Sequence, residues 1–195
     1  MEYTGVTLDR RALKLSSEEL TKELTTLEQD IYQLAGMEFN INSAKQVGEI
    51  LFDRLKIEEK AKKTKTGSYS TSEDVLEKIR NKHPIVSKLL EYRGLKKLLS
   101  TYIDALPELI DTTTGKIHTS FNQTVTSTGR LSSTNPNLQN IPIRDEIGRE
   151  IRRAFTSDSE ACVFFSADYS QIELRIMAHL SGDTNMIEAF RSGED

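Results

Sequence analysis

The sequence predicts an α+β fold, in which a mainly helical part precedes a part that mixes strands with helices. Three observations predict it. Apolar residues recur at spacings of four and three between residues 20 and 34, which is typical of one helix face. Residues 117–125 alternate between apolar and polar, as a half-buried strand does. Residues 161–165 form a continuous apolar run, which favours a strand covered on both faces.

Helix signals dominate the first half of the chain. The predicted helices cover residues 16–35, 43–55, 72–83 and 85–106, and a short strand is expected within residues 3–9. Ser16 with Glu19 forms a capping box at the start of the first helix, and Gly36 supplies a left-handed stop. Ser43 with Gln46 forms a second capping box. Gly94 lies inside the last helix, where it either allows a backbone to approach closely or is tolerated at about 1 kcal/mol.

Composition excludes several classes of protein. The 195 residues suffice for one large or two small domains, and no apolar stretch approaches the roughly 20 residues that span a bilayer. The three histidines are far apart and show no zinc-site spacing. The single cysteine, Cys162, is expected to be a small buried apolar residue. A cytoplasmic location without membrane contact is therefore expected.

Charge is distributed unevenly along the chain. The net charge is −4, but residues 56–97 carry twelve basic and six acidic side chains. This segment is therefore +6, and the remainder is −10. Such a distribution indicates either a phosphate-binding surface on an acidic scaffold or, more simply, a solvated helical face. Residues 56–72 lack periodicity and are expected to form a basic loop.

Asp168 follows the predicted strand 161–165, where a carboxylate could be presented at a sheet edge. A carboxylate on a rigid strand suits a hard cation such as Mg²⁺. The same residue could instead act as the N-cap of a helix over residues 171–180. Spacing alone leaves both interpretations open.

The motif DYSQIELR at residues 168–175, together with TGRLSSTNPNLQNIP at residues 128–142, resembles the family-A DNA polymerases. The resemblance extends in the same order through EYTGV, TKTG, HPIV, STYID, FNQT, IRRAF and AHLSGD, so it covers essentially the whole chain. It implies a helical thumb over residues 16–106 and part of a palm, with a small antiparallel sheet, over residues 107–195. Residues 1–15 would be a strand leading into the palm and a linker.

The resemblance also implies a catalytic site. Asp168 would hold two catalytic Mg²⁺ ions, with help from the backbone carbonyl of Tyr169. Ser170 and Gln171 would lie near the incoming triphosphate, and Glu173 would exclude a ribose 2′-hydroxyl. In the absence of the resemblance, Glu173 is an acid favoured in a first helical turn by the helix dipole.

Contacts to primer–template DNA are implied elsewhere in the chain. Arg130 would donate to the minor groove, and residues of the NPNLQN loop would touch the backbone and base edges nearby. Asn137 also fits a turn that satisfies its own backbone. The residues expected to contact DNA are Asn42, Ser43, Lys65, Ser70, Ser72, Arg93, Lys97, Tyr102, Arg130, Asn137, Gln139 and Asn140.

The resemblance places the triphosphate-binding fingers helix and a second palm carboxylate beyond the last residue of this chain. We therefore expect the complete protein to be a monomeric DNA-directed DNA polymerase that uses dNTPs, and the 195 residues alone to be inactive. The competing interpretation of the isolated chain is a non-enzymatic module that binds duplex DNA.

Overall fold

The computed structural model describes residues 1–59, 61–64, 67–143 and 146–193. The chain divides into two compact units, Met1–Asp158 and Ser159–Asp195. The elements of the first unit are β1 (Thr7–Leu8), α1 (Arg10–Ala35), α2 (Ala44–Gly48), the π-helix η1 (Glu49–Arg54), α3 (Glu73–Lys78), the 3₁₀ helix η2 (Arg80–Lys82), α4 (Pro84–Leu98), the π-helix η3 (Leu99–Ile103), α5 (Ala105–Glu108), β2 (Ser120–Asn122), β3 (Ser132–Thr134), α6 (Glu146–Arg153) and β4 (Phe155–Thr156). The second unit contains α7 (Ile172–Ser181) and α8 (Thr184–Ser192).

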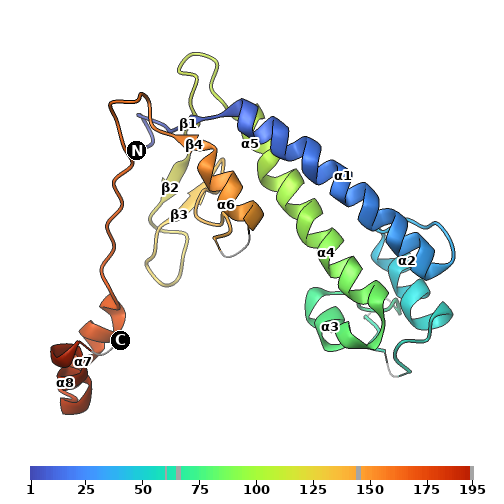
Figure 1. The fold of residues 1–195 in the computed structure, drawn as a ribbon. Helices are drawn as coiled ribbons and strands as arrows, with labels where there is room; N and C mark the ends of the chain where they lie inside the picture. The colour runs from blue at the N-terminus through green and yellow to red at the C-terminus, as the bar shows by residue number, and fades with distance from the viewer. Residues whose placement is uncertain (60, 65–66, 144–145, 194–195) are drawn as a thin grey trace. The chain divides into compact units, whose positions relative to one another are not determined.

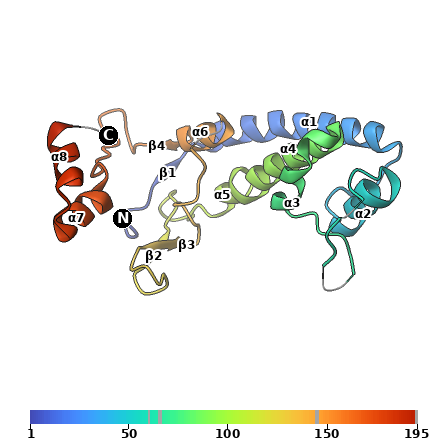
Figure 2. The ribbon, with the colours of Figure 1, turned by 90° about the horizontal axis from the view of Figure 1, so that it is seen from below.

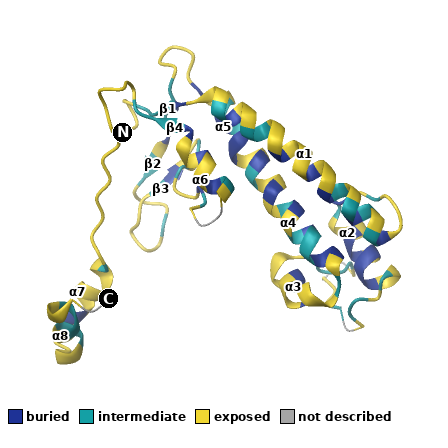
Figure 3. Ribbon diagram, in the orientation of Figure 1, coloured by how far each residue is buried: buried dark blue, intermediate teal, exposed yellow. Residues whose placement is uncertain are grey.

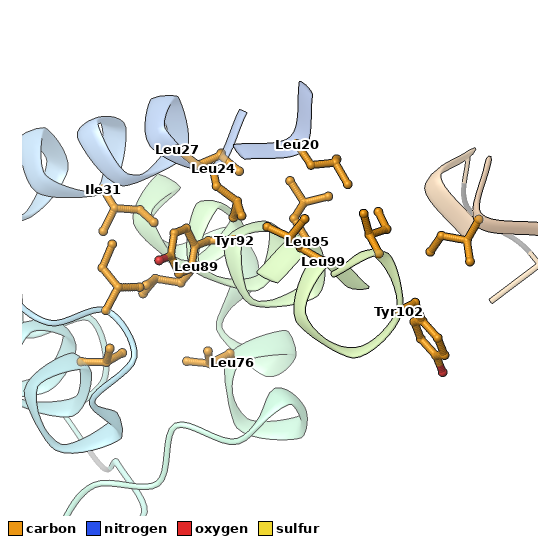
Figure 4. Close-up of a cluster of buried hydrophobic side chains, with 14 of the residues drawn as sticks. Leu20, Leu24, Leu27, Ile31, Leu76, Leu89, Tyr92, Leu95, Leu99 and Tyr102 are labelled. Carbon is orange, nitrogen blue, oxygen red and sulfur yellow. The ribbon is translucent and has the colours of Figure 1, made fainter. Parts of the chain in front are cut away.

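Helices α1 and α4 lie side by side along most of their length (Figures 1 and 2). The buried positions of both helices face each other (Figure 3). On α1 the predicted stripe is confirmed, because its members Leu20, Leu24, Leu27 and Ile31 are buried. In Figure 4 these side chains meet a second row, which consists of Leu89, Tyr92, Leu95 and Leu99. The first unit is thus built on an antiparallel pair of helices that share one apolar core.

The start of α1 differs from the prediction. The helix begins at Arg10 and its N-cap is Asp9, whose carboxylate accepts hydrogen bonds from the amides of Arg11 (2.9 Å) and Ala12 (3.1 Å). The capping box at Ser16 is wrong, because Asp9, seven residues earlier, caps the helix and Ser16 lies inside it. The predicted stop is confirmed, since Gly36 has a left-handed φ of 70°.

The remaining helices largely follow the prediction. Ser43 and Ser72 are the N-caps of α2 and α3, and the Ser43 hydroxyl accepts from the Gln46 amide at 3.4 Å. The single helix expected over residues 85–106 is α4, η3 and α5 in succession, and α5 continues past Pro107 to Glu108. Proline is accommodated there because α5 is a single turn, in which its missing amide proton breaks no helical ladder.

In the described residues the β-structure consists of two small antiparallel sheets, which confirms the α+β class. β1 pairs with β4, with Thr7 opposite Thr156, and β2 pairs with β3, with Phe121 opposite Ser133. The alternating stretch 117–125 forms a strand only at β2, while Ile117 makes isolated bridges to Val6 and Ile110. Among the described residues no helix is long and apolar enough to cross a membrane.

The second unit is small and mostly exposed (Figure 3). α7 packs against α8, and Ala178 is its buried residue. The Arg175 guanidinium lies 4.6 Å from the centre of the Phe190 ring and donates to the Ser170 carbonyl at 2.9 Å. Ile172, Ile176 and Leu180 are exposed, and no described strand covers them.

Hydrogen bonds from Lys116 and Thr7 to Asp158, called the clamp below, hold the end of the first unit. The Asp158 carboxylate accepts hydrogen bonds from the Lys116 ammonium (2.6 Å) and the Thr7 hydroxyl (2.8 Å). It therefore joins the chain two residues after β4 to β1 and to the segment before β2. The hydrogen bond from Lys116, followed by that from Thr7, holds the pKa of Asp158 below its ordinary value of 3.8.

The Asp158→Asn variant should show a stability that depends less on pH than that of the wild type. A depressed folded-state pKa contributes stability that is complete above the unfolded value and is lost as pH falls through the folded value. The wild type should therefore unfold at higher denaturant concentration than the variant at neutral pH, and this difference should shrink below about pH 3.8. Denaturant titrations at a series of pH values measure it. A difference that stays constant down to pH 2 would contradict the clamp.

Candidate functional site

A groove of about 660 Å³ runs between the helical part and the loop that follows β3. One wall comes from α4 and η3 and includes Lys97 and Tyr102. The other wall comes from the loop and includes Asn137 and Asn140. Glu73, at the start of α3, also lines it. The structure thus brings together four residues that the sequence analysis selected from two segments far apart in the chain.

The loop wall is attached to its surroundings by side chains. The Tyr102 hydroxyl donates to the Asn140 carbonyl at 2.7 Å, and this connects η3 directly to the loop. Arg152 of α6 donates to the carbonyls of Ile141 (3.0 Å) and Pro142 (3.2 Å). Tyr102 is therefore a support of the groove as well as part of its lining, and burial raises the pKa of its hydroxyl.

Asn137 forms the local turn that was the alternative interpretation of this residue. Its side-chain oxygen accepts from the Gln139 amide at 3.0 Å, which closes a local turn. This bond uses only the oxygen, and the Nδ2 group provides two further donors. Gln139 and Arg130 are exposed, and neither lines the groove.

Arg93 supports the chain between Ser70 and Ser72. Its guanidinium is half-buried, and it donates to the carbonyl of Thr71 and, at 3.3 Å, to the Thr71 hydroxyl. Thr71 is buried. The hydroxyls of Ser70 and Ser72, on either side of it, lie 3.5 Å apart. Arg93 was expected to contact phosphate, but two of its five donors are engaged within the protein, so it first of all orients this segment.

The other predicted thumb contacts are separate from the groove. Asn42 is exposed beside Ser43, whose hydroxyl caps α2. The predicted contact at Lys65 lies outside the described residues. The basic loop contains a bridge between Lys63 and Tyr69, and the Tyr69 hydroxyl donates to Asp53 at 2.6 Å.

In the second unit the structure corrects the expected surroundings of Asp168. Residues 161–165 form no strand, and the side chains of Val163 and Phe165 are 86% and 90% exposed. An apolar run needs neighbouring strands for its backbone hydrogen bonds, and no described strand pairs with it. Cys162, expected to be buried, is exposed for the same reason.

Asp168 lies in this extended segment with its side chain exposed. It does not cap the following helix, because the N-cap of α7 is Gln171 and no side chain caps that end. Gln171 has a left-handed φ of 51°, so the chain turns sharply between Asp168 and the helix. Glu173 is exposed in the first turn of α7.

The donors near Asp168 fit Mg²⁺ in kind. A carboxylate and the backbone carbonyl of Tyr169 are hard oxygen ligands, which this cation prefers. Within the described residues, however, no group of three acidic, histidine or cysteine side chains gathers to hold a metal. Within the described residues, the segment therefore offers at most part of a ligand set for such a cation.

Comparison with known proteins identifies the family. The model of DNA polymerase family A matches residues 10–195. The chain belongs to this family. It is 57% identical over 195 residues to DNA polymerase I of Geobacillus stearothermophilus and 54% identical to the thermostable DNA polymerase I of Thermus aquaticus. All of the chain is matched in both cases, but it spans only 22% and 23% of those relatives.

A solved structure of the family has the same fold. The polymerase domain of Pol1 from M. smegmatis, in complex with DNA primer–template and dNTP, is 45% identical and has a TM-score of 0.84. The similarity covers 98% of this chain and 33% of that one.

Sequence reasoning missed the supports of the site. Thr119, Ser133 and Arg152 were not selected, although their hydrogen bonds determine the course of the loop wall. Thr119 and Ser133 read as ordinary strand residues, and their pairing across 14 positions leaves no local signal. Glu73 was also missed, because an acid in a first helical turn needs no further explanation.

Gly94 lines the groove, and a Cβ atom built there meets no atom within 4 Å. No described backbone approaches it, so the structure favours simple tolerance of this glycine. Gly94→Ala should therefore raise the unfolding free energy by up to about 1 kcal/mol, because alanine loses less backbone entropy in a helix. Denaturant unfolding measures this change.

Gly48→Ala is the matched control. A Cβ atom there would lie 2.8 Å from the Cβ of Tyr69, so this variant should lose about 1–3 kcal/mol through overpacking. Equal effects of the two substitutions would contradict the packing described for both helices.

Proposed function

We propose that the chain is the DNA-gripping and nucleotide-binding part of a DNA-directed DNA polymerase, which extends a primer 3′-hydroxyl on a DNA template. The observation that carries the proposal is the groove, because Lys97, Tyr102, Asn137 and Asn140 line one surface although they come from two separate segments. Family membership supports the same reaction.

The composition of the groove suits a polymerase, which must hold a duplex without selecting its sequence. Amide and hydroxyl groups hydrogen-bond to phosphates and to minor-groove acceptors, which all base pairs share. Lys97 adds one cation that is not committed to a salt bridge in the described part of the chain. In this proposal the further DNA contacts are Asn42, Ser43, Lys65, Ser70, Ser72, Arg93, Arg130 and Gln139.

The proposed chemistry lies in the second unit. The Asp168 carboxylate and the Tyr169 carbonyl would hold Mg²⁺, and Ser170 and Gln171 would adjoin the triphosphate. Bound Mg²⁺ supplies charge neutralisation for the attacking 3′-oxygen and the leaving pyrophosphate. Glu173, exposed at the start of α7, would block a ribose 2′-hydroxyl. The exposure of Asp168 supports this role, because ions and substrate can reach it.

A second candidate applies to the 195 residues by themselves. The groove belongs to the first unit, while Asp168 belongs to the second. Duplex binding in the groove therefore does not depend on the residue proposed for catalysis. We propose that the isolated chain binds duplex DNA without extending it, and that the complete protein acts as a monomer in the cytoplasm.

Lys97→Gln should weaken binding to a primer–template duplex by about tenfold. This factor corresponds to the loss of one charge-assisted hydrogen bond of about 1.5 kcal/mol. The slope of log affinity against log salt should also become shallower by about one, since one fewer counterion is released. Fluorescence anisotropy of a labelled duplex over a salt series measures both quantities.

Lys96→Gln is the matched control, because Lys96 is the exposed neighbour of Lys97 and does not line the groove. It removes the same charge from the same helix and should change the affinity by less than about twofold. Equal losses in both variants would mean that only the general positive field binds DNA.

Asp168→Ala tests the proposed chemistry in the intact polymerase of which this chain is a part. It should lower the rate of nucleotide incorporation at least about a thousandfold, because one bridging carboxylate is lost. Glu173→Ala should retain dNTP incorporation and shift the preference toward ribonucleotides by about a hundredfold. Single-turnover primer extension with each nucleotide measures these effects. Glu188→Ala, in exposed α8, serves as control, and normal turnover of Asp168→Ala would refute the metal role.

A further inference from the structure

Two buried hydroxyl groups lie beneath the loop wall of the groove. Ser133, in β3, is fully buried, and Thr119, just before β2, is 8% exposed. Together with Thr71 they are the buried polar side chains of the described residues. Burying a hydroxyl costs about 1–3 kcal/mol unless it is hydrogen-bonded, so such groups require a structural reason.

Both hydroxyls are bonded to the loop backbone. The Ser133 hydroxyl accepts from the Leu138 amide and lies within donating distance of the Pro136 carbonyl, each at 3.1 Å. The Thr119 hydroxyl lies 2.7 Å from that of Ser133. It is also within donating distance of the carbonyls of Pro136 (2.8 Å) and Thr134 (3.1 Å).

The two hydroxyl protons can be assigned in only a few ways. If Thr119 donates to Pro136, then Ser133 donates either to the same carbonyl or to the Thr119 oxygen. If Thr119 donates to Thr134, then Ser133 again donates either to Pro136 or to the Thr119 oxygen. If Thr119 donates to Ser133, then Ser133 donates to Pro136. Every arrangement leaves the Leu138 amide on the Ser133 oxygen and joins the loop to both side chains. The path of the backbone over residues 134–138 is thus fixed from inside.

This path determines which side chains reach the groove. Leu138 packs against the apolar core, while Asn137 on one side of it and Asn140 beyond it line the groove. Asn135 has a left-handed φ of 55°, so the chain between β3 and Leu138 departs from extended geometry. Strand pairing ends at Thr134, and the Asn122 amide donates to the side chain of Thr134 only, so hydrogen bonds to the backbone carbonyls and amide of this segment come from the two hydroxyls.

We propose that Thr119 and Ser133 are positioning residues for duplex binding, whose shared hydroxyl network holds the Thr134–Leu138 backbone so that Asn137 and Asn140 face the groove. The inference rests on the DNA-binding role of the groove proposed above. Neither residue lines the groove, so both act through the loop.

The experiment compares Thr119→Val and Ser133→Ala, which remove one hydroxyl each, with the conservative Thr119→Ser. The 195-residue chain is titrated with a labelled primer–template duplex, and amide exchange of Leu138 is followed by NMR. Thr119→Val and Ser133→Ala should each weaken duplex binding about tenfold and speed exchange of the Leu138 amide by at least that factor. Thr119→Ser should bind within about twofold of the wild type, because it keeps the hydroxyl.

Ser132→Ala is the matched control. The Ser132 oxygen is also buried, but within the described structure it has no hydrogen-bond partner. Its removal should alter neither duplex affinity nor Leu138 exchange. A general packing defect would instead affect all three positions and lower the thermal midpoint without a selective change in affinity.

The possible outcomes separate the inference from the proposed function. Unchanged Leu138 exchange in Thr119→Val and Ser133→Ala overturns the inference, and so does faster exchange with unaltered duplex affinity. If the wild type binds no duplex while exchange responds as expected, the proposed function fails and the hydroxyl support of the loop stands. If Ser133→Ala does not fold, Thr119→Val and Thr119→Ser still decide between the outcomes.

Discussion

Burial of the apolar face of α1 against α4 is the interaction on which the rest of the first unit depends. Each fully buried leucine or isoleucine in this seam contributes about 1.5–3 kcal/mol. The seam fixes α4 and its continuation η3, so the residues that turn away from the core acquire defined positions. Lys97 lies on that outer side, while Tyr102 is buried in the core and its hydroxyl donates to the Asn140 carbonyl of the loop. The groove therefore depends on the packing of one face of α4 in the core, which fixes the position of the opposite face.

The two walls of the groove are held by different physical means. The helical wall is held by non-directional packing, which tolerates volume-conserving substitutions. The loop wall is held by directional bonds from Thr119, Ser133, Tyr102 and Arg152, where the loss of one atom leaves a buried group without its partner. For the proposed binding of duplexes of any sequence, the helix would supply rigidity and the loop would supply correctly oriented amides.

Periodicity predicted α1 well, because a buried face repeats every 3.6 residues whatever its partner. It failed at the start of α1, since the first turns contain charged residues and the true cap, Asp9, precedes them. The run 161–165 predicted a tendency toward burial, but no partner strand is visible in a local pattern. Lys97, Asn137 and Asn140, which the resemblance selected as DNA contacts, line one groove, and their contact with DNA stays a prediction. They could not indicate Thr119 with Ser133, because hydroxyls in strands are common and their pairing depends on the tertiary fold.

The clamp at Asp158 has a consequence for local unfolding. Local unfolding that begins beyond the last strand tends to detach that strand first, and β4 pairs with β1 over only two residues. The hydrogen bonds from Thr7 and Lys116 hold Asp158, two residues after β4, so fraying that begins at Ser159 meets a barrier before it reaches β1. Local unfolding of the segment around Asp168 can therefore occur without unfolding of the helices that form the groove.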